Sequence, residues 1–168
     1  RPLVVLLGPT AVGKSRVAIQ VAKHFDTEIL TADSRQVYRG MDIGTDKPTA
    51  EDLQRVRHRL LDLVNPDDAF NTGWYRRAAL DHIEQLYVAD RLPLVVGGTG
   101  LYIRTLIRGI CPAPQADPIV RADLKKLREQ AGRTGLYAEL IRVDPAAAAR
   151  LHPNDELKVM RALEVYRL

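Results

Sequence analysis

Residues 8–15 read GPTAVGKS and match the pattern G-x-x-x-x-G-K-[ST] in full. In this pattern, glycines allow backbone N–H groups to turn inward around phosphate oxygens, and the following helix adds its partial positive charge. The lysine reaches the terminal phosphate, and the final hydroxyl is the expected Mg²⁺ ligand. The sequence therefore predicts a polyphosphate and Mg²⁺ site built from Gly8, Pro9, Thr10, Ala11, Val12, Gly13, Lys14 and Ser15.

A carboxylate is predicted to lie near this phosphate loop. Most P-loop NTPases carry an Asp directly after a buried apolar strand, but here Leu94–Val96 is followed by Gly97-Gly98-Thr99. Asp33 instead follows a second apolar run, Glu28–Ala32. The carboxyl ends of parallel strands share one edge of a sheet, where ligands bind. We therefore expect Asp33 to act as a general base and Thr99 to orient a reactant. The alternatives are that each side chain only caps a loop or a helix.

The elements around these residues predict an α/β fold. Leu3–Leu7 is a continuous apolar run typical of a strand buried on both faces, and a helix is expected to begin at Lys14. Strands and helices alternate up to Gly109, which indicates a P-loop NTPase-like parallel sheet flanked by helices. The remaining helices of this part are expected at 49–61, 72–90 and 101–108.

The pattern changes after Gly109, where Pro112, Pro114 and Pro118 interrupt the chain. Only helical patterns follow, which predict a small helical insertion lobe after the third strand. The helices of this part are expected at 118–131, 136–143, 145–151 and from 156 onward. We expect a P-loop catalytic core at 1–115, the helical lobe at 116–150, and a helix returning to the core at 151–168.

The composition narrows the class of protein. Lys and Arg number 25 against 21 Asp and Glu, a net charge of +4 that is compatible with a polyanionic partner. The single cysteine, Cys111, has no partner for an internal disulfide, and no His or Cys cluster has zinc-ligand spacing. No apolar run reaches the length of a membrane span. We therefore expect a cytoplasmic monomer without membrane contact. The chain lacks an initiator Met and a stop signal for its last helix, so we expect a longer protein.

Several longer blocks resemble the tRNA dimethylallyltransferases (tRNA isopentenyltransferases). The blocks are GPTAVGKS at 8–15, ADSRQVYRGMDIGTDKP at 32–48, HRLLD at 58–62, PLVVGGTGLYIRTLIRG at 93–109, ADPIVRADL at 116–124 and DPAAAARLHPNDELKVMRALEVY at 144–166. These transferases move a dimethylallyl group from dimethylallyl diphosphate to N6 of the adenosine next to the anticodon, adenosine 37, and release diphosphate. The resemblance implies this activity, with tRNA as partner and Mg²⁺ as cofactor.

The resemblance also implies roles for individual residues. Thr10 to Ser15 would bind the donor, and Asp33 would be the base that takes the proton of the adenine amino group. Arg161 would neutralise the departing diphosphate, and Lys14 would assist at the phosphates. The implied tRNA contacts are Asp33, Ser34, Arg35, Gln36, Thr99, Arg121, Leu157, Lys158, Val159, Met160 and Arg161.

The segment FNTGWYRRAAL at 70–80 departs from the family pattern, which leaves its packing open. Three other functions remain possible from the sequence. A small-molecule or nucleotide kinase also uses a P-loop with an Asp on the second strand. An adenylate isopentenyltransferase would prenylate free AMP. A non-enzymatic, nucleotide-dependent RNA-binding module would bind RNA without any transfer of a prenyl group.

Overall fold

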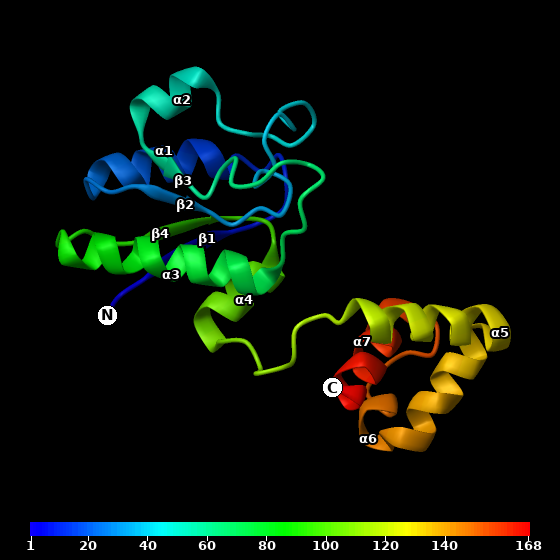
Figure 1. The fold of residues 1–168 in the computed structure, drawn as a ribbon. Helices are drawn as coiled ribbons and strands as arrows, with labels where there is room; N and C mark the ends of the chain where they lie inside the picture. Colours follow the sequence, from blue (N-terminus) through cyan, green and yellow to red (C-terminus); the bar gives the residue numbers. More distant parts are fainter. The chain divides into compact units, whose positions relative to one another are not determined.

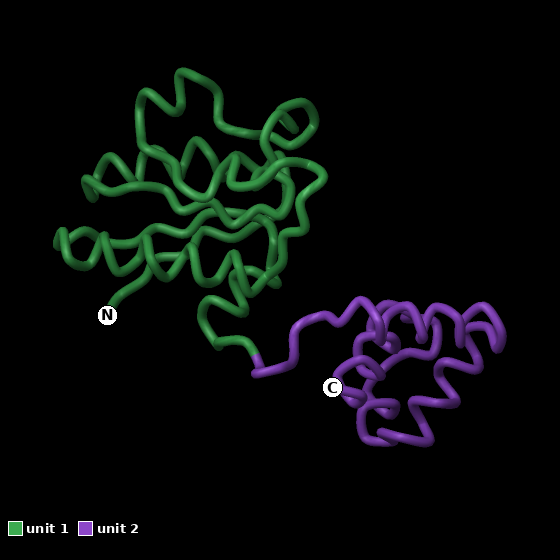
Figure 2. The backbone as a smooth tube through the Cα atoms, in the orientation of Figure 1, with its two compact units in different colours: residues 1–110 green, residues 111–168 purple.

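Figure 1 shows the computed structural model, which describes residues 1–168. The chain forms two units, unit 1 at 1–110 and unit 2 at 111–168 (Figure 2). The elements of unit 1 are β1 (Val4–Leu7), α1 (Lys14–His24), β2 (Ile29–Thr31), α2 (Ala50–Arg55), β3 (His58–Arg59), α3 (Thr72–Val88), β4 (Leu94–Gly97) and α4 (Gly100–Arg108). The elements of unit 2 are α5 (Pro118–Val143), α6 (Pro145–Ala148) and α7 (Glu156–Arg167).

Unit 1 is built on a four-stranded sheet with the strand order β1-β4-β2-β3. Every strand pair is parallel, so the carboxyl ends of the strands lie at one edge. Leu7 pairs with Gly97, and Thr31 pairs with Val96, which aligns the ends of the three longer strands. The predicted α/β fold with a parallel sheet flanked by helices is confirmed.

Apolar side chains alternate between the two faces of the sheet, as the two-residue period of a strand requires. Leu30 and Val95 are buried with residues of α3 and α4. Ile29, Leu94 and Val96 are buried on the opposite face with residues of α1. Each strand is therefore fixed in register from both faces, and the loops at the carboxyl edge are held by a packed core.

Helix α2 ends at Arg55, whereas the sequence predicted a helix to Leu61. Thr49 and Asp52 form a capping box at its start, and the backbone becomes extended at Val56. The chain then pairs with β2 as strand β3, and the Ile29 amide donates to the Arg57 carbonyl. Hydrogen bonds with the edge of the sheet thus replace the last turn of the predicted helix, because an open sheet edge needs a partner.

Unit 2 has its own apolar core, made by α5, α6 and α7. Leu124, Leu140, Val159 and Leu163 are buried together in this core. Gly132 lies in the left-handed region, with φ of 68°, and kinks α5 at the point where the sequence predicted a gap between two helices. No helix of the structure has the length and apolar character that a membrane span requires.

The segment 151–168 was expected to return to the P-loop core. The structure instead places α7 with the other helices of unit 2, where it packs mainly on α5. Buried leucines on α5 give α7 an apolar surface within its own unit. Unit 1 ends at Ile110 and unit 2 begins at Cys111, a few residues before the boundary expected at 115.

The ends of β2 and β4 approach one another closely at Gly97. A Cβ atom on Gly97 would lie 2.1 Å from the Ala32 carbonyl oxygen, a separation that no side chain can occupy. The same carbonyl accepts a hydrogen bond from the Thr99 amide at 3.1 Å. At Gly97 the close neighbour is the backbone that follows β2, and both Gly97 and Gly98 line a pocket.

We predict that Gly97→Ala destabilises unit 1, because the new methyl group must push β2 and β4 apart. The expected loss of unfolding free energy is about 1–3 kcal/mol, typical of overpacking. Urea unfolding followed by circular dichroism measures this loss. Gly98→Ala is the matched control, since its Cβ would lie 3.6 Å from the nearest atom, the Gly8 carbonyl oxygen. Equal unfolding midpoints for the two variants would contradict the packing argument.

Candidate functional site

A pocket opens at the carboxyl edge of the sheet in unit 1. Several predicted residues meet there, including Lys14, Ser15 and Asp33. The pocket combines the phosphate loop, the segment after β2, the end of β4 and a loop that follows Tyr38. Its lining residues are Thr10, Lys14, Ser15, Ala18, Ile29, Thr31, Asp33, Arg35, Gln36, Gly44, Thr45, Asp46, Pro48, His58, Val96, Gly97 and Gly98.

The phosphate loop connects β1 to α1 and leaves several hydrogen-bond donors free. Ala11 and Gly13 have positive φ values of 65° and 84°, which bend the backbone ahead of the helix. Gly13 caps α1 without a side-chain hydrogen bond, and the amides of Lys14, Ser15 and Arg16 have no protein acceptor, whereas the Val17 amide donates to the Gly13 carbonyl. The Lys14 ammonium donates only to the Pro9 carbonyl of its own loop, at 2.5 Å. These groups suit the binding of an anion such as diphosphate.

Asp33 has one carboxylate oxygen bound within its loop and one without a protein partner. Its Oδ1 accepts hydrogen bonds from the Arg35 amide at 2.8 Å and the Gln36 amide at 3.4 Å. The loop-cap alternative is therefore present in the structure. The half-buried carboxylate also lines the pocket, and its Oδ2 is available to accept a proton or a hydrogen bond from a ligand.

Thr99 connects the segments that follow β2 and β4. Its Oγ1 accepts a hydrogen bond from the Ser34 amide at 2.9 Å and gives α4 no side-chain cap, so the helix-cap alternative is wrong. Since the oxygen acts as acceptor, the Thr99 hydroxyl hydrogen remains free for a ligand. Thr99 thus binds the residue that follows Asp33, although neither Ser34 nor Thr99 is among the residues that line the pocket.

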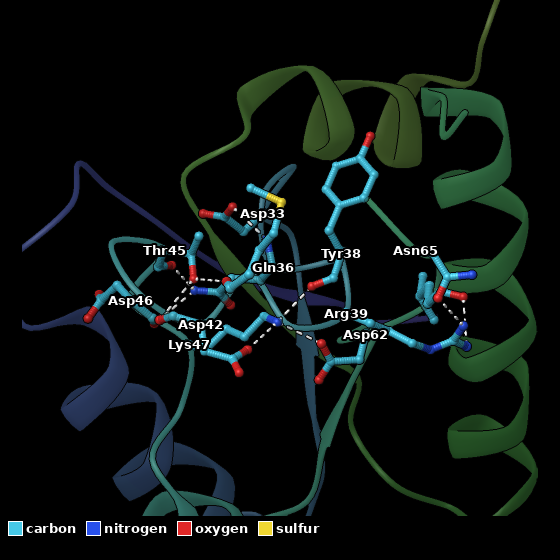
Figure 3. Close-up of polar contacts among 12 residues, drawn as sticks. Asp33, Gln36, Tyr38, Arg39, Asp42, Thr45, Asp46, Lys47, Asp62 and Asn65 are labelled. Carbon is cyan, nitrogen blue, oxygen red and sulfur yellow. Dashed lines mark hydrogen bonds and ion pairs between the residues drawn. The ribbon is translucent and has the colours of Figure 1, made fainter. Parts of the chain in front are cut away.

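Gln36 is less available than the sequence indicated. Its side-chain Nε2 donates to the carbonyl oxygens of Thr45 and Asp46, at 2.9 and 2.8 Å (Figure 3). The Gln36 side chain lines the pocket, yet its amide hydrogens hold the facing loop. Arg35 is exposed at the same edge and makes no side-chain hydrogen bond within the protein.

Sequence reasoning missed one wall of the pocket. Gly44, Thr45, Asp46 and Pro48 lie in an irregular loop whose only signal was its membership of the block at 32–48. His58, the first residue of the block at 58–62, lies half-buried in the pocket wall. Burial lowers the pKa of His58, although its contact with the Val56 carbonyl and the charge of Asp52 act in the opposite direction.

The residues of the pocket fit a magnesium ion that arrives with a diphosphate. No group of three or more His, Cys, Asp or Glu side chains is arranged to hold a metal ion. Mg²⁺ in phosphate sites usually takes one or two protein oxygens and completes its shell with phosphate and water. The Ser15 hydroxyl provides such an oxygen in this pocket.

The departure from the family pattern at 70–80 is resolved by aromatic packing. Asn71 caps α3 through the Trp74 amide, and Phe70 contacts both Trp74 and Tyr102 edge to face. Tyr75 is buried and stacks on Tyr102, with ring centroids 4.0 Å apart. Burial raises the pKa of Tyr102 to about 12. These rings join α3 to α4 and so fix the helix that begins after Thr99.

Two candidate RNA-contacting arginines of unit 2 share one buried carboxylate. Glu164 is only 1% exposed. Its Oε1 accepts from Arg121 Nε at 2.8 Å and from the Asp117 amide at 2.9 Å. Its Oε2 accepts from Arg161 Nη1 at 2.5 Å, while Arg161 Nη2 donates to the Pro114 carbonyl. Both guanidinium groups are partly exposed, so each keeps donors for a phosphate.

The remaining residues of the predicted stretch 157–161 differ in exposure. Leu157 is 83% exposed and Lys158 forms an ion pair with Asp155. Val159 is 1% exposed and belongs to the apolar core, so its side chain does not face RNA. Met160 packs against the same core. The helical period explains this division, because one face of α7 must cover α5.

Comparison with protein families gives two matches. A family described as IPP transferase matches residues 36–168, and one described as isopentenyl transferase matches residues 2–69. Among curated proteins, the tRNA dimethylallyltransferase of Geobacter sulfurreducens is 50% identical over 164 residues, which are 98% of this chain and 53% of that protein. The corresponding protein of Methylococcus capsulatus is 48% identical over 167 residues, 99% of this chain and 54% of that protein. The chain thus spans about half the length of these relatives.

Two solved structures are also similar to this chain. The full-length tRNA isopentenylpyrophosphate transferase from Bacillus halodurans is 40% identical, with a TM-score of 0.65. That match covers 99% of this chain and 55% of the other chain. A eukaryotic dimethylallyltransferase acting on tRNA is 29% identical, with a TM-score of 0.84, over 99% of this chain and 41% of the other.

The Glu164 cluster predicts how the stability of unit 2 depends on pH. Burial alone would raise the pKa of Glu164, but hydrogen bonds from Arg121, Arg161 and the Asp117 amide outweigh burial and lower the pKa below its usual 4.5. A lowered folded-state pKa stabilises the protein above the unfolded-state pKa, and this contribution disappears as the pH falls through the folded value. Below about pH 4.5 the protein therefore loses stability.

Glu164→Gln removes this charge, and we expect it to lower the unfolding free energy at neutral pH by about 1–3 kcal/mol, because the two arginines are partly solvated. The variant should also lose less stability than the wild type as the pH falls below about 4.5, because it lacks the carboxylate that becomes protonated. Chemical unfolding at several pH values measures both effects. An identical acid dependence in the two proteins would show that Glu164 is not the group responsible.

Proposed function

The chain belongs to the IPP transferase family, and we propose that it carries the active site of a transferase that moves a dimethylallyl group from dimethylallyl diphosphate to N6 of an adenosine in the tRNA anticodon loop. One observation supports this more than any other. A phosphate loop with free donors and a carboxylate with one free oxygen line the same pocket. The relatives are named as dimethylallyltransferases that act on tRNA, and a phosphate loop beside a carboxylate suits that reaction.

The phosphate loop would act on the donor. In an allylic diphosphate the C1–O bond weakens as positive charge spreads over the allyl group and negative charge gathers on the leaving diphosphate. The free amides at the start of α1 and the Lys14 ammonium would stabilise that negative charge. Mg²⁺, held at the Ser15 hydroxyl, would add positive charge at the same oxygens.

Asp33 would act on the acceptor. As the bond between C1 and N6 forms, the C1–O bond breaks, diphosphate leaves, and the adenine amino group loses one proton. Asp33 Oδ2 is free to accept that proton, while Oδ1 stays bound to the Arg35 and Gln36 amides. The Thr99 hydroxyl, which accepts from the amide of the residue after Asp33, would orient the reacting groups. A positioned base of this kind contributes roughly 10²–10⁴-fold to the rate.

Unit 2 would contribute to RNA binding. A base stacked inside RNA cannot reach a pocket, but a base of a single-stranded loop can be turned out of the stack. Arg121 and Arg161 present guanidinium groups that are partly exposed, and such groups bind phosphate through paired hydrogen bonds. We propose that these arginines contact the tRNA backbone, or the diphosphate in the case of Arg161, in a monomer that acts in the cytoplasm.

The test is to incubate the full-length protein with dimethylallyl diphosphate, Mg²⁺ and an anticodon stem-loop RNA. Mass spectrometry of the digested RNA should show adenosine heavier by one dimethylallyl group. Parallel reactions with AMP and with ATP plus a small hydroxyl compound distinguish the other functions. Prenylated AMP would indicate an adenylate isopentenyltransferase, and phosphoryl transfer would indicate a kinase. RNA binding without any transfer would indicate a binding module.

We predict that Asp33→Asn lowers kcat for RNA prenylation by roughly 10²–10⁴-fold, because the amide keeps the loop contacts but cannot take the proton. Binding of inorganic diphosphate with Mg²⁺, measured by calorimetry, should change by no more than about twofold, since Asp33 is not part of the phosphate loop. Turnover equal to that of the wild type would remove Asp33 from the mechanism.

Lys14→Met, in contrast to Asp33→Asn, should weaken the binding of diphosphate. Loss of one charged hydrogen bond is worth about 1.5–3 kcal/mol, which weakens diphosphate binding by roughly 10–100-fold. Calorimetry with inorganic diphosphate measures the change. Lys23→Met, at an exposed lysine on the same helix, is the matched control and should bind diphosphate as the wild type does. Unchanged affinity in Lys14→Met would contradict the assignment of the phosphate loop.

A further inference from the structure

Lys47 places its ammonium group in an almost completely covered position near the pocket. Its side chain is 8% exposed. The Nζ atom donates to the Tyr38 carbonyl at 2.7 Å, to Asp42 Oδ1 at 2.7 Å and to Asp62 Oδ1 at 2.6 Å (Figure 3). An ammonium group has three hydrogens, and each of them has a partner here. This lysine therefore differs from a solvated surface lysine, whose ion pair contributes little.

The charge of Lys47 is retained despite its burial. Burial would lower the pKa of Lys47, but the hydrogen bonds and charges of Asp42 and Asp62 outweigh it and raise the pKa above the ordinary value. The ammonium is thus charged throughout the physiological range. A buried charge is tolerated only when it is paired and hydrogen-bonded, so loss of the lysine would leave the Tyr38 carbonyl and two carboxylates without their common donor.

The three partners come from three different parts of the chain. Tyr38 lies shortly after Asp33, Asp42 lies in the irregular loop 41–48, and Asp62 follows strand β3. Lys47 joins the far end of that loop to all of them. The loop contains no helix or strand, and its tip residue Ile43 is 98% exposed. Its conformation therefore depends on the hydrogen bonds and ion pairs that side chains make with it.

A second tie connects this loop to the proposed catalytic carboxylate. Gln36 Nε2 donates to the carbonyls of Thr45 and Asp46, and the Gln36 amide donates to Asp33 Oδ1. The same loop residues form a wall of the pocket. Lys47 thus fixes the loop from one side and Gln36 fixes it from the other, and Gln36 also contacts Asp33.

We propose that Lys47 is a positioning residue of the transfer reaction, which holds the loop 41–48 in place as the acceptor-side wall of the pocket beside Asp33. This inference rests on the proposed function. Lys47 makes no hydrogen bond with the phosphate loop, whose ties are local to residues 8–15. Its effect should therefore fall on the RNA acceptor and leave the binding of diphosphate unaffected.

The test uses Lys47→Met in the full-length protein, with Lys23→Met as an exposed control in the same unit. We expect kcat/KM for anticodon stem-loop prenylation to fall by roughly 10–100-fold, the range for a displaced positioning element. Affinity for inorganic diphosphate with Mg²⁺ should stay within about twofold of the wild type. Hydrogen exchange followed by mass spectrometry should show faster exchange in residues 41–48 and unchanged exchange in β1 and β4.

Asp42→Asn provides a milder variant, because it removes one exposed carboxylate and keeps an oxygen acceptor. It should lower kcat/KM for RNA prenylation by a smaller factor and leave the affinity for diphosphate unchanged. This variant therefore tests the inference even if Lys47→Met does not fold. Wild-type kcat/KM in both folded variants would overturn the inference. So would a joint fall of turnover and diphosphate affinity, since that indicates general unfolding. Absence of prenyl transfer by the wild type would instead refute the proposed function, while hydrogen exchange would still report whether Lys47 holds the loop.

Discussion

The site depends on how closely β2 and β4 approach one another at their carboxyl ends. Gly97 has no room for a side chain against the Ala32 carbonyl, and that carbonyl binds the Thr99 amide. The Thr99 hydroxyl in turn binds the Ser34 amide. These contacts place the segment after β2 beside the segment after β4. Since β4 also pairs with β1, they bring Asp33 into the same pocket as the phosphate loop.

The sequence was sufficient to predict the parts of this arrangement that depend on local rules. A strand, a glycine-bearing turn and a helix in succession predicted the phosphate loop, and parallel strands predicted that Asp33 would lie at the same edge. The end of α2 at Arg55 was missed, because the edge of β2 offers hydrogen bonds that no local pattern records. The pocket wall at Gly44–Pro48 and His58 was missed for a related reason, since its residues meet only in the folded chain.

In unit 2 the sequence likewise did not predict which charged residues pair with one another. The resemblance noted in the sequence implied Arg121 and Arg161 as RNA contacts, but it gave no sign that both share Glu164. A buried carboxylate with two arginines is tolerated because each of its oxygens is hydrogen-bonded. Likewise, Val159 belongs to the predicted RNA-facing stretch, yet the period of α7 turns it into the core. Ion pairing and burial depend on the tertiary structure. They therefore differ between residues that are neighbours in one sequence motif.

The two sides of the pocket are held by different kinds of interaction. The phosphate loop is fixed at both ends by regular structure, β1 and α1, and its free donors follow from the geometry of a helix start. The opposite wall belongs to an irregular loop, which is held by the Lys47 ammonium and the Gln36 amide. The phosphate loop is thus held mainly by the elements at its two ends. The opposite wall has no such elements of its own, so its shape depends on the contacts that Lys47 and Gln36 make.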